Sequence, residues 1–419
     1  MKICVLSFAG LDTDGRDATR ILKEMRSLVM AGYKVKAIGL RLREDILQKE
    51  QYYGAEINRI NPALSFHRKL QWEIPNPRLF SKLKWLYTLT IKNTLASGLA
   101  LFKAAWKEDA DVYHCFGIYS LVPGFFLKML KRKKVIYDAY EVPHQSISTL
   151  SSLGLFAKPL GKVVSLIELL MSSRIDYILT IPSANDEYLN RFKRWNHNVV
   201  FLRNSPPLDW YNASNFRLGD EYDGQKVLFY MGAFTRTKGF FKMLEVFNIV
   251  NKNFQMVKLV LVGSFDEITA FDNIKEEAIN YIQSRNLQDN VVITGYIPWQ
   301  EIPGYLSIAD IAMYINQPNP VQLTSQGSSK FSEYLAASLP IIASDFPGIG
   351  SIVKKYGCGI IVDSSNEQEI AIAALRLLNS PDLAREMGKN ARKAFEQEFN
   401  WGLEEEKLLQ VYGELKREN

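Results

Sequence analysis

The sequence predicts an α/β protein with two domains, each built on a parallel sheet. A chain of 419 residues is too long for a single hydrophobic core and suits two domains of roughly 200 residues. Its residues are 47% hydrophobic and 23% charged, which is typical of folded globular proteins. Short apolar runs alternate with helical patterns along the chain, as in parallel sheets covered by helices. The boundary falls at Ser205–Pro207, where two prolines stiffen the chain ahead of the polar segment 208–225.

The cysteines and the lengths of the apolar runs indicate in which cellular compartment the protein works. Cys4, Cys115 and Cys358 are odd in number, far apart and without metal-ligand spacing. This pattern favours a reducing compartment over a disulfide framework. The sequence opens on a strand, MKICVLSF, rather than on a signal peptide, and no apolar run reaches the ~18 residues that a bilayer requires. We therefore expect a cytoplasmic protein.

Charge is distributed unevenly along the chain. Residues 1–200 hold 30 lysines and arginines against 18 acidic residues, whereas residues 201–419 hold 21 against 27. Basic and aromatic residues alternate in His67–Lys92, and basic residues cluster again in Lys128–Lys134. Such segments suit an anionic membrane surface. Nucleic acid would use the same charges, but no nucleic-acid-binding motif accompanies them, so we expect no nucleic-acid partner. A solvated helix face is the other alternative.

A short basic loop follows a predicted strand in the second domain. Val227–Met231 is apolar, and Gly232 permits a tight turn after it. Arg236 and Lys238 then precede a helix that begins near Gly239. Loops at the carboxyl ends of strands are where α/β folds hold anions. The pattern predicts an anion site, with two solvated loop cations as the alternative.

A helix start with a carboxylate nearby lies further along the chain. Ser328 and Ser329 open the helix, Glu333 lies within its first turns, and Leu339–Ala343 forms a short apolar strand. Free N–H groups at a helix N-terminus bind phosphate, and a carboxylate can accept two hydrogen bonds from a ribose diol. This combination predicts a binding site for a nucleoside diphosphate. The alternative is an ordinary helix–strand unit with a solvated glutamate.

An ordered set of segments resembles the GT-B glycosyltransferases of family 4, the retaining group 1 class. The resemblance covers nearly the whole chain. In the first domain the matching segments are MKICVLSF, the loop with Asp14, Gly15 and Arg16, AGYKVKAIGL, VIYDAYE, IDYILTIPSANDEYL and FLRNSPP. In the second domain they are MGAFTRTKG, VKLVLVG, VVITGYIPWQEIPGYLSIADIAM and the Ser328–Gly350 segment.

The resemblance implies the GT-B fold, in which two Rossmann-like parallel-sheet domains face a central cleft. Residues 1–206 would bind the acceptor and residues 207–400 the nucleotide-sugar donor. The amphipathic helix at 401–419 would pack back on the first domain. Fixed arginine and lysine side chains would stabilise the departing diphosphate, so the resemblance implies transfer with no metal and no cofactor.

The resemblance also assigns residues to the donor. Arg236 and Lys238 would contact the diphosphate in a catalytic role. Glu333 aligns with the family's second glutamate, which binds ribose, and the base would lie near Gly295 and Tyr296. The other expected donor-binding residues are Gly232, Ser325, Gln326, Gly327, Ser328, Ser329 and Lys330.

Three positions depart from the family pattern. Ser325 stands where the family's first glutamate would be, so Ser325, its neighbours or their N–H groups would meet the donor sugar. Ala233 replaces an arginine, which leaves that work to Arg236. Tyr140 replaces the histidine of a D-x-H-E motif, which puts acid–base catalysis there in doubt. A leaving-group oxygen can still deprotonate the acceptor on the same face of the sugar.

In the first domain we expect Tyr140 and Asp138 at the reacting sugar. The expected acceptor-binding residues are Gly15, Arg16, His114 and Glu141. For His114 the alternative is a structural histidine, which is the commoner role after a strand.

The sequence thus indicates retaining transfer of a hexose-type sugar from a nucleoside diphosphate sugar. The expected acceptor is a lipid-linked glycan or a surface-polysaccharide intermediate at the inner face of the cell membrane. Two alternatives remain. One is an epimerase of the same fold. The other is a catalytically degenerate subunit that only binds a nucleotide sugar, for which Ser325 and Tyr140 would be the supporting evidence.

Overall fold

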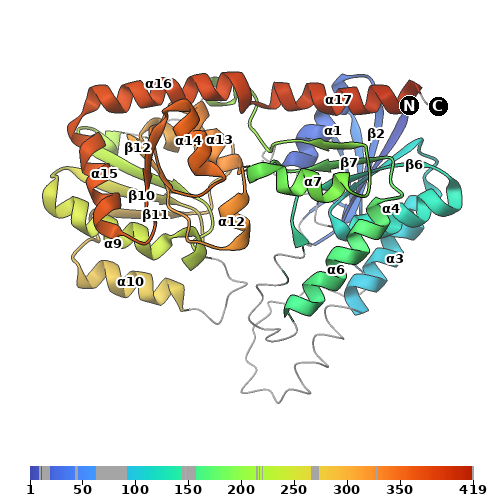
Figure 1. The fold of residues 1–419 in the computed structure, drawn as a ribbon, viewed down its shortest axis with the longest axis horizontal. Helices are drawn as coiled ribbons and strands as arrows, with labels where there is room; N and C mark the ends of the chain where they lie inside the picture. Colours follow the sequence, from blue (N-terminus) through green and yellow to red (C-terminus); the bar gives the residue numbers. More distant parts are fainter. Residues whose placement is uncertain are drawn as a thin grey trace, which may run out of the picture. The chain divides into compact units, whose positions relative to one another are not determined.

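Two compact units, each with its own sheet, make up the chain in the computed structural model (Figure 1). The first unit comprises Met1–Pro182, Asp186–Leu202 and Glu405–Asn419, and the second comprises Ser183–Asn185 and Arg203–Glu404. The expectation of an α/β chain with two parallel-sheet domains is confirmed. The structure describes residues 1–8, 11, 19–42, 46–62, 92–143, 147, 157–213, 216, 218, 220–265, 273–326 and 328–417.

The sheet of the first unit is parallel except at one edge. Its strand order is β3-β4-β2-β1-β5-β6-β7-β8, and β3 alone runs antiparallel to its neighbour. Only Tyr53 and Gly54 separate β3 from β4, and both have positive φ, as a two-residue hairpin requires. The strands are β1 (Lys2–Ser7), β2 (Lys34–Leu40), β3 (Lys49–Tyr52), β4 (Ala55–Ile60), β5 (Val112–Phe116), β6 (Lys134–Ala139), β7 (Tyr177–Thr180) and β8 (Val199–Phe201).

Helices from both ends of the sequence cover this sheet. The last helix, α17, buries Leu408, Val411, Tyr412 and Leu415 at 0–2% exposure. Among the described residues, no helix is both long and apolar enough to cross a membrane. The helices are α1 (Arg20–Met30), α3 (Lys92–Lys107), α4 (Ile118–Lys131), α6 (Ala157–Ser172), α7 (Glu187–Lys193) and α17 (Trp401–Arg417), whose first turn belongs to the second unit.

The sheet of the second unit is entirely parallel in the described residues. Its order is β11-β10-β9-β12-β13-β14, so the chain reverses its direction of travel across the sheet between β9 and β12. Ligands of open α/β sheets bind beyond the carboxyl ends of the strands at such a reversal. The strands are β9 (Lys226–Met231), β10 (Val257–Val262), β11 (Val291–Gly295), β12 (Ile311–Tyr314), β13 (Ile341–Ser344) and β14 (Gly359–Val362).

Two apolar clusters cover the two faces of the second sheet, as a parallel sheet requires. One includes side chains from α9, α10 and α15, and the other includes side chains from α13, α14 and α16. The α-helices are α8 (Trp210–Ala213), α9 (Phe240–Asn253), α10 (Ile274–Ser284), α11 (Ile302–Ser307), α12 (Pro320–Thr324), α13 (Ser329–Ala336), α14 (Ile349–Tyr356), α15 (Glu367–Asn379) and α16 (Pro381–Glu398).

Candidate functional site

The loop after β9 is held in one tight arrangement. Gly232 leaves the strand at a φ of +136°, a region open mainly to glycine. The Lys238 backbone N–H then donates to the Thr235 hydroxyl at 3.2 Å, which closes a single 3₁₀ turn over Arg236–Lys238. Gly239 follows at a φ of +74° and starts α9. The expected tight turn and the expected helix start are both confirmed.

Lys330, in the first turn of α13, lies near Lys238 at this end of the sheet. Its Nζ lies 3.4 Å from the Tyr230 hydroxyl, and 4.6 and 5.0 Å from the ring centroids of Tyr230 and Tyr314. Burial, and then the charge of Lys238, hold the pKa of Lys330 well below its usual range, while Glu333 acts in the opposite direction. Burial also lowers the pKa of Lys238. A bound anion would stabilise the charged forms of these two neighbouring lysines, which burial disfavours.

The start of α13 adds positive potential beside Lys330. Ser328 accepts the Phe331 and Ser332 backbone N–H groups through its carbonyl, at 3.2 and 3.4 Å. The Ser328 side chain makes no capping bond to the helix and instead hydrogen-bonds Tyr314. The first N–H groups of a helix have no carbonyl within it, and the helix dipole is positive there. An anion bound beside Lys330 would therefore also meet the positive end of this helix.

Glu333 is nearly buried one turn further along the same helix. Glu333 is only 7% exposed, and its Oε1 accepts a hydrogen bond from the Trp299 indole N–H at 3.1 Å. Trp299 in turn stacks on Trp210, with ring centroids 5.1 Å apart. Trp299 was not expected at the site. No local signal indicates it, because the pairing joins two separate segments.

The other expected donor residues lie around the same sheet edge. Gly295 ends β11 at a φ of +75° and accepts the Gly263 N–H at 3.0 Å, while Tyr296 is 58% exposed. Ser325 forms an isolated antiparallel bridge with Ser183, which fixes its backbone. Gln326 is half-buried, and the donor role of each stays a prediction. Gly327 lies outside the described residues.

The contacts that the structure gives for the Arg236 side chain are with residues other than Lys238 and Lys330. Its guanidinium forms a 2.6 Å ion pair with Glu277 and lies over the Phe241 ring at 4.8 Å. Both partners of the ion pair are about half exposed, so opening it would cost only ~0–1 kcal/mol. The contact of Arg236 with a diphosphate stays a prediction, and it would require only that this weak ion pair opens.

A cavity of about 370 Å³ opens elsewhere on the second sheet, beyond β13 and β14. Its lining includes three carboxylates, Asp345, Asp363 and Glu369. An acidic lining repels a diphosphate. The cavity therefore does not suit the donor, and the donor site at Lys238 and Lys330 stays a prediction.

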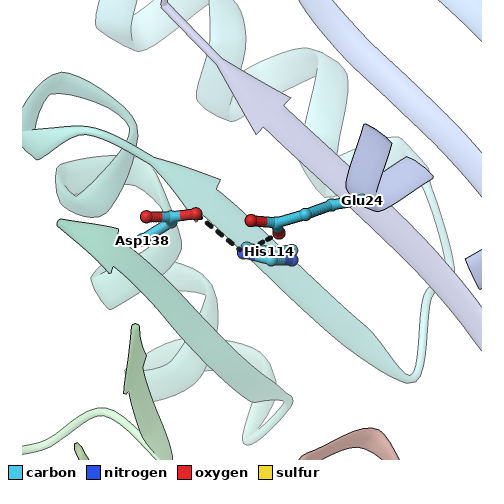
Figure 2. Close-up of side chains that lie close together, drawn as sticks. All are labelled: Glu24, His114 and Asp138. Atoms are coloured by element: carbon cyan, nitrogen blue, oxygen red, sulfur yellow. Dashed lines mark ion pairs between the residues drawn. The ribbon is translucent and has the colours of Figure 1, made fainter. Parts of the chain in front are cut away.

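In the first unit, the expected residues Asp138 and His114 belong to a buried polar cluster (Figure 2). Asp138 Oδ1 lies 3.0 Å from an Arg20 guanidinium nitrogen, and Arg20 also pairs with Glu24 at 2.8 Å. His114 Nε2 lies 3.5 Å from Glu24 Oε2 and 4.0 Å from Asp138 Oδ2. His114 Nδ1 lies 2.8 Å from the Tyr412 hydroxyl, on α17.

Burial sets the charges in this cluster. It raises the pKa of Asp138 well above the usual range and lowers the pKa of His114 to about 4. His114 is therefore neutral near pH 7, and the Arg20 guanidinium pairs with the carboxyl groups of both Glu24 and Asp138. Glu24, His114 and Asp138 offer atoms within 4.8 Å of one another that could hold a metal. The Arg20 cation already contacts both carboxylates, so we interpret the cluster as a structural network.

This burial bears on two expected roles. Asp138 and His114 are both 0% exposed, so in this arrangement neither side chain reaches a substrate. The structural alternative for His114 fits the geometry, and the roles at the substrate stay predictions. Tyr140 follows β6 near Phe116, and burial raises its pKa, so the phenol stays protonated near pH 7. Burial also raises the pKa of Glu141. Gly15 and Arg16 lie outside the described residues.

The low pKa of His114 predicts an acid-sensitive stability. The unfolded chain protonates His114 below about pH 6.5, whereas the folded protein does so only near pH 4. Acid therefore favours unfolding, and this contribution should lower the free energy of unfolding by about 2 kcal/mol between pH ~7.5 and pH ~5. His114→Gln keeps a partner for Tyr412 but does not titrate. Urea titrations should show a steeper loss with acid for the natural protein, and parallel pH profiles would contradict the expectation.

Comparison with known proteins adds a family match. Residues 214–394 match the family model described as Glycosyl transferases group 1. The putative glycosyltransferase YtcC of Bacillus subtilis is 26% identical over 51% of this chain and 52% of its own length. The poly(ribitol-phosphate) alpha-N-acetylglucosaminyltransferase of Staphylococcus aureus is 22% identical over 77% of this chain and 59% of its own length. The chain spans about half the length of the curated relatives it matches.

Solved structures are similar over nearly the whole chain. Sucrose-phosphate synthase from Thermosynechococcus elongatus superposes with a TM-score of 0.72 at 19% identity, over 100% of both chains. HepE from Anabaena, in complex with UDP-glucose, superposes with a TM-score of 0.69 at 12% identity, over 99% of this chain and 100% of its own. At such identities the likeness is one of fold.

Proposed function

We propose that this chain, whose residues 214–394 carry the group 1 glycosyltransferase domain on a GT-B fold, transfers a hexose-type sugar with retention from a nucleoside diphosphate sugar. The observation that supports this most strongly is the pairing of Lys238 and Lys330 beside the N-terminus of α13. The arrangement suits a diphosphate, because two cations and a helix dipole act on one place. Glu333, nearly buried in the same helix, suits a ribose diol.

The proposed chemistry depends on the leaving group. Negative charge develops on the diphosphate as the sugar departs, and preorganised cations in a partly desolvated site stabilise it strongly. Lys238 and Lys330 supply this charge without a metal or another cofactor. Tyr140 is a neutral phenol, so the proton of the acceptor passes to the departing oxygen on the same face. This account accommodates the loss of the family histidine.

The proposed acceptor is a glycan or lipid-linked glycan at the inner face of the cell membrane. Named relatives act on poly(ribitol-phosphate) and on chitobiosyldiphosphodolichol, and one serves capsular polysaccharide biosynthesis. The basic first half of the chain suits an acceptor that carries phosphate. The expected membrane contact through His67–Lys92 lies mostly outside the described residues.

A subunit that binds a nucleotide sugar without turning it over is the second candidate. Ser325 stands in the place of the family's first glutamate and lacks a carboxylate. An epimerase of the same fold stays an alternative. Turnover separates these candidates.

A screen of UDP-, GDP- and ADP-sugars tests the proposal. One of them should raise the melting temperature, since a ligand at ~100 times its Kd adds about 2.7 kcal/mol to the free energy of unfolding. That sugar nucleotide should then be hydrolysed or transferred in the presence of EDTA. Binding without turnover would favour the non-catalytic subunit, and no binding would overturn the donor class. Activity lost to EDTA and restored by Mg²⁺ would contradict the metal-independent mechanism.

A further inference from the structure

Three helices of the first unit expose an unusual amount of apolar surface. Helices α3, α4 and α6 lie side by side on this unit (Figure 1). Of the 22 large apolar side chains that are exposed among the described residues, 13 lie on them. Contiguous apolar surface on a folded domain marks an interaction site. We call this surface the apolar face; its residues are Leu95, Leu99, Trp106, Tyr119, Val122, Phe126, Met129, Leu130, Leu160, Val163, Leu166, Ile167 and Leu170.

Helix α6 buries small or polar side chains and exposes large apolar ones, the reverse of an ordinary amphipathic helix. Its buried residues are Ala157, Gly161, Glu168 and Ser172, which are small or polar. Its exposed residues recur at helical spacing, and they are large and apolar: Leu160, Val163, Leu166, Ile167 and Leu170. A helix that served only the core would place its leucines inward. The outward stripe of α6 therefore has a use other than folding.

Helix α4 shows the same arrangement. Its buried Gly124 leaves so little room that a Cβ there would lie 2.2 Å from Cys115 Sγ. The small residue lets α4 approach the sheet closely, while the large Phe126 faces outward at 46% exposure. Phe126 packs edge-on against Phe102 of α3, with centroids 6.4 Å apart, so the two helices form one continuous surface.

The charges on these helices are almost all positive. Their sequences hold seven lysines and a single acidic residue, Glu168. Glu168 is fully buried and pairs with Arg191 at 2.5 Å, so it adds no negative charge to the surface. Lys131 Nζ donates to the Trp106 carbonyl and lies 4.9 Å from its ring centroid, which places a cation beside an aromatic side chain.

We propose that the apolar face docks on an anionic bilayer, with its leucines and aromatic rings in the interface and its lysines at the headgroups. Apart from Lys128, which pairs with Asp176 at 2.6 Å, the exposed charges that these three helices carry are positive. Two copies of the face would therefore repel each other, which disfavours self-association as the reason for it. The inference rests on the proposed function in one respect: docking would bring the protein close to a lipid-linked acceptor in the membrane. It places a membrane contact on α3, α4 and α6, and the expected contact through His67–Lys92 stays a separate prediction.

Sedimentation with lipid vesicles tests the proposal. The full chain should sediment with vesicles that contain phosphatidylglycerol, and much less with phosphatidylcholine alone. Val163→Glu with Leu170→Glu should lower the partition coefficient at least about tenfold, because two side chains that enter the interface become anionic. The matched control is Met256→Glu with Ile372→Glu, at apolar positions of the second unit that are at least as exposed, which should bind like the natural protein.

A second variant and two further readouts decide the remaining outcomes. Lys158→Glu with Lys162→Glu leaves the apolar side chains in place and should also release the protein from anionic vesicles. Nucleotide-sugar binding should stay intact in every variant, so a failure of donor binding with normal sedimentation would count against the proposed function alone. Equal sedimentation of all variants, or none by the natural protein, would overturn the docking face. So would an oligomer, detected by light scattering, that the Val163→Glu variant dissociates without any vesicle binding.

Discussion

Replacing Lys330 with methionine should lower kcat for sugar transfer about 100-fold. With a diphosphate bound beside it, Lys330 Nζ would be a preorganised positive charge, and removing one such group from a catalytic site typically costs ~10²–10³ in rate. Methionine keeps the length and apolar contacts of the stem against Tyr230 and Tyr314. The variant should not lose stability, because burial already disfavours the charged lysine.

This pair of effects separates a catalytic lysine from a structural one. Steady-state kinetics with the nucleotide sugar found by the screen gives the first effect, and the melting temperature gives the second. Lys354→Met is the matched control, because Lys354 lies on the same unit with its side chain 67% exposed. Unchanged kcat in a folded Lys330→Met protein would contradict the predicted position of the diphosphate at Lys330.

Gly239→Ala should destabilise the second unit by more than 3 kcal/mol. Gly239 has a φ of +74°, and a Cβ there would lie 1.8 Å from the Ile315 carbonyl oxygen. The left-handed backbone alone costs ~1–2 kcal/mol for alanine, and the clash with fixed backbone adds to it. Because Gly239 closes the Arg236–Lys238 turn, donor binding should weaken as well.

A second glycine provides the control for this change. Gly224 has nearly the same φ, +73°, with no atom within 4 Å of an added Cβ. Gly224→Ala should therefore show the conformational cost alone. In thermal melts a domain of this size loses ~2–4 °C per kcal/mol, so the two variants should differ by several degrees. Equal melting temperatures would mean that the backbone around Ile315 relaxes freely.

The features that the sequence predicts well here are local ones. The turn at Gly232, the helix start at Gly239 and the helix–strand order after Ser328 follow from residue type and spacing within a dozen positions. The family resemblance adds the two-domain fold. These predictions depend on neighbours in the chain, which the sequence displays directly.

The contacts that sequence reasoning missed join distant segments. Trp299 donates to Glu333, and the buried His114 meets Tyr412 from the far end of the chain. Arg236 finds Glu277 on a separate helix, a pairing that depends on how α10 packs. The exposed apolar stripe of α6 could not be predicted from periodicity, because apolar residues at helical spacing have the same pattern whether the fold buries them or not. Such features depend on topology, which fixes the neighbours of each face.

The discontinuity of the first unit has a consequence for protein synthesis. Its sheet is complete once Phe201 has been translated, yet Leu408, Tyr412 and Leu415 of α17 remain to be added to its interior. Domains generally fold as they emerge from the ribosome, starting with the N-terminal one. Here the first unit is incomplete until residues 405–419 have been translated, and until then His114 lacks its hydrogen-bond partner Tyr412. By that point nearly all of the second unit has been translated. The chain of the second unit is therefore complete before that of the first, although the sheet of the first unit is translated earlier.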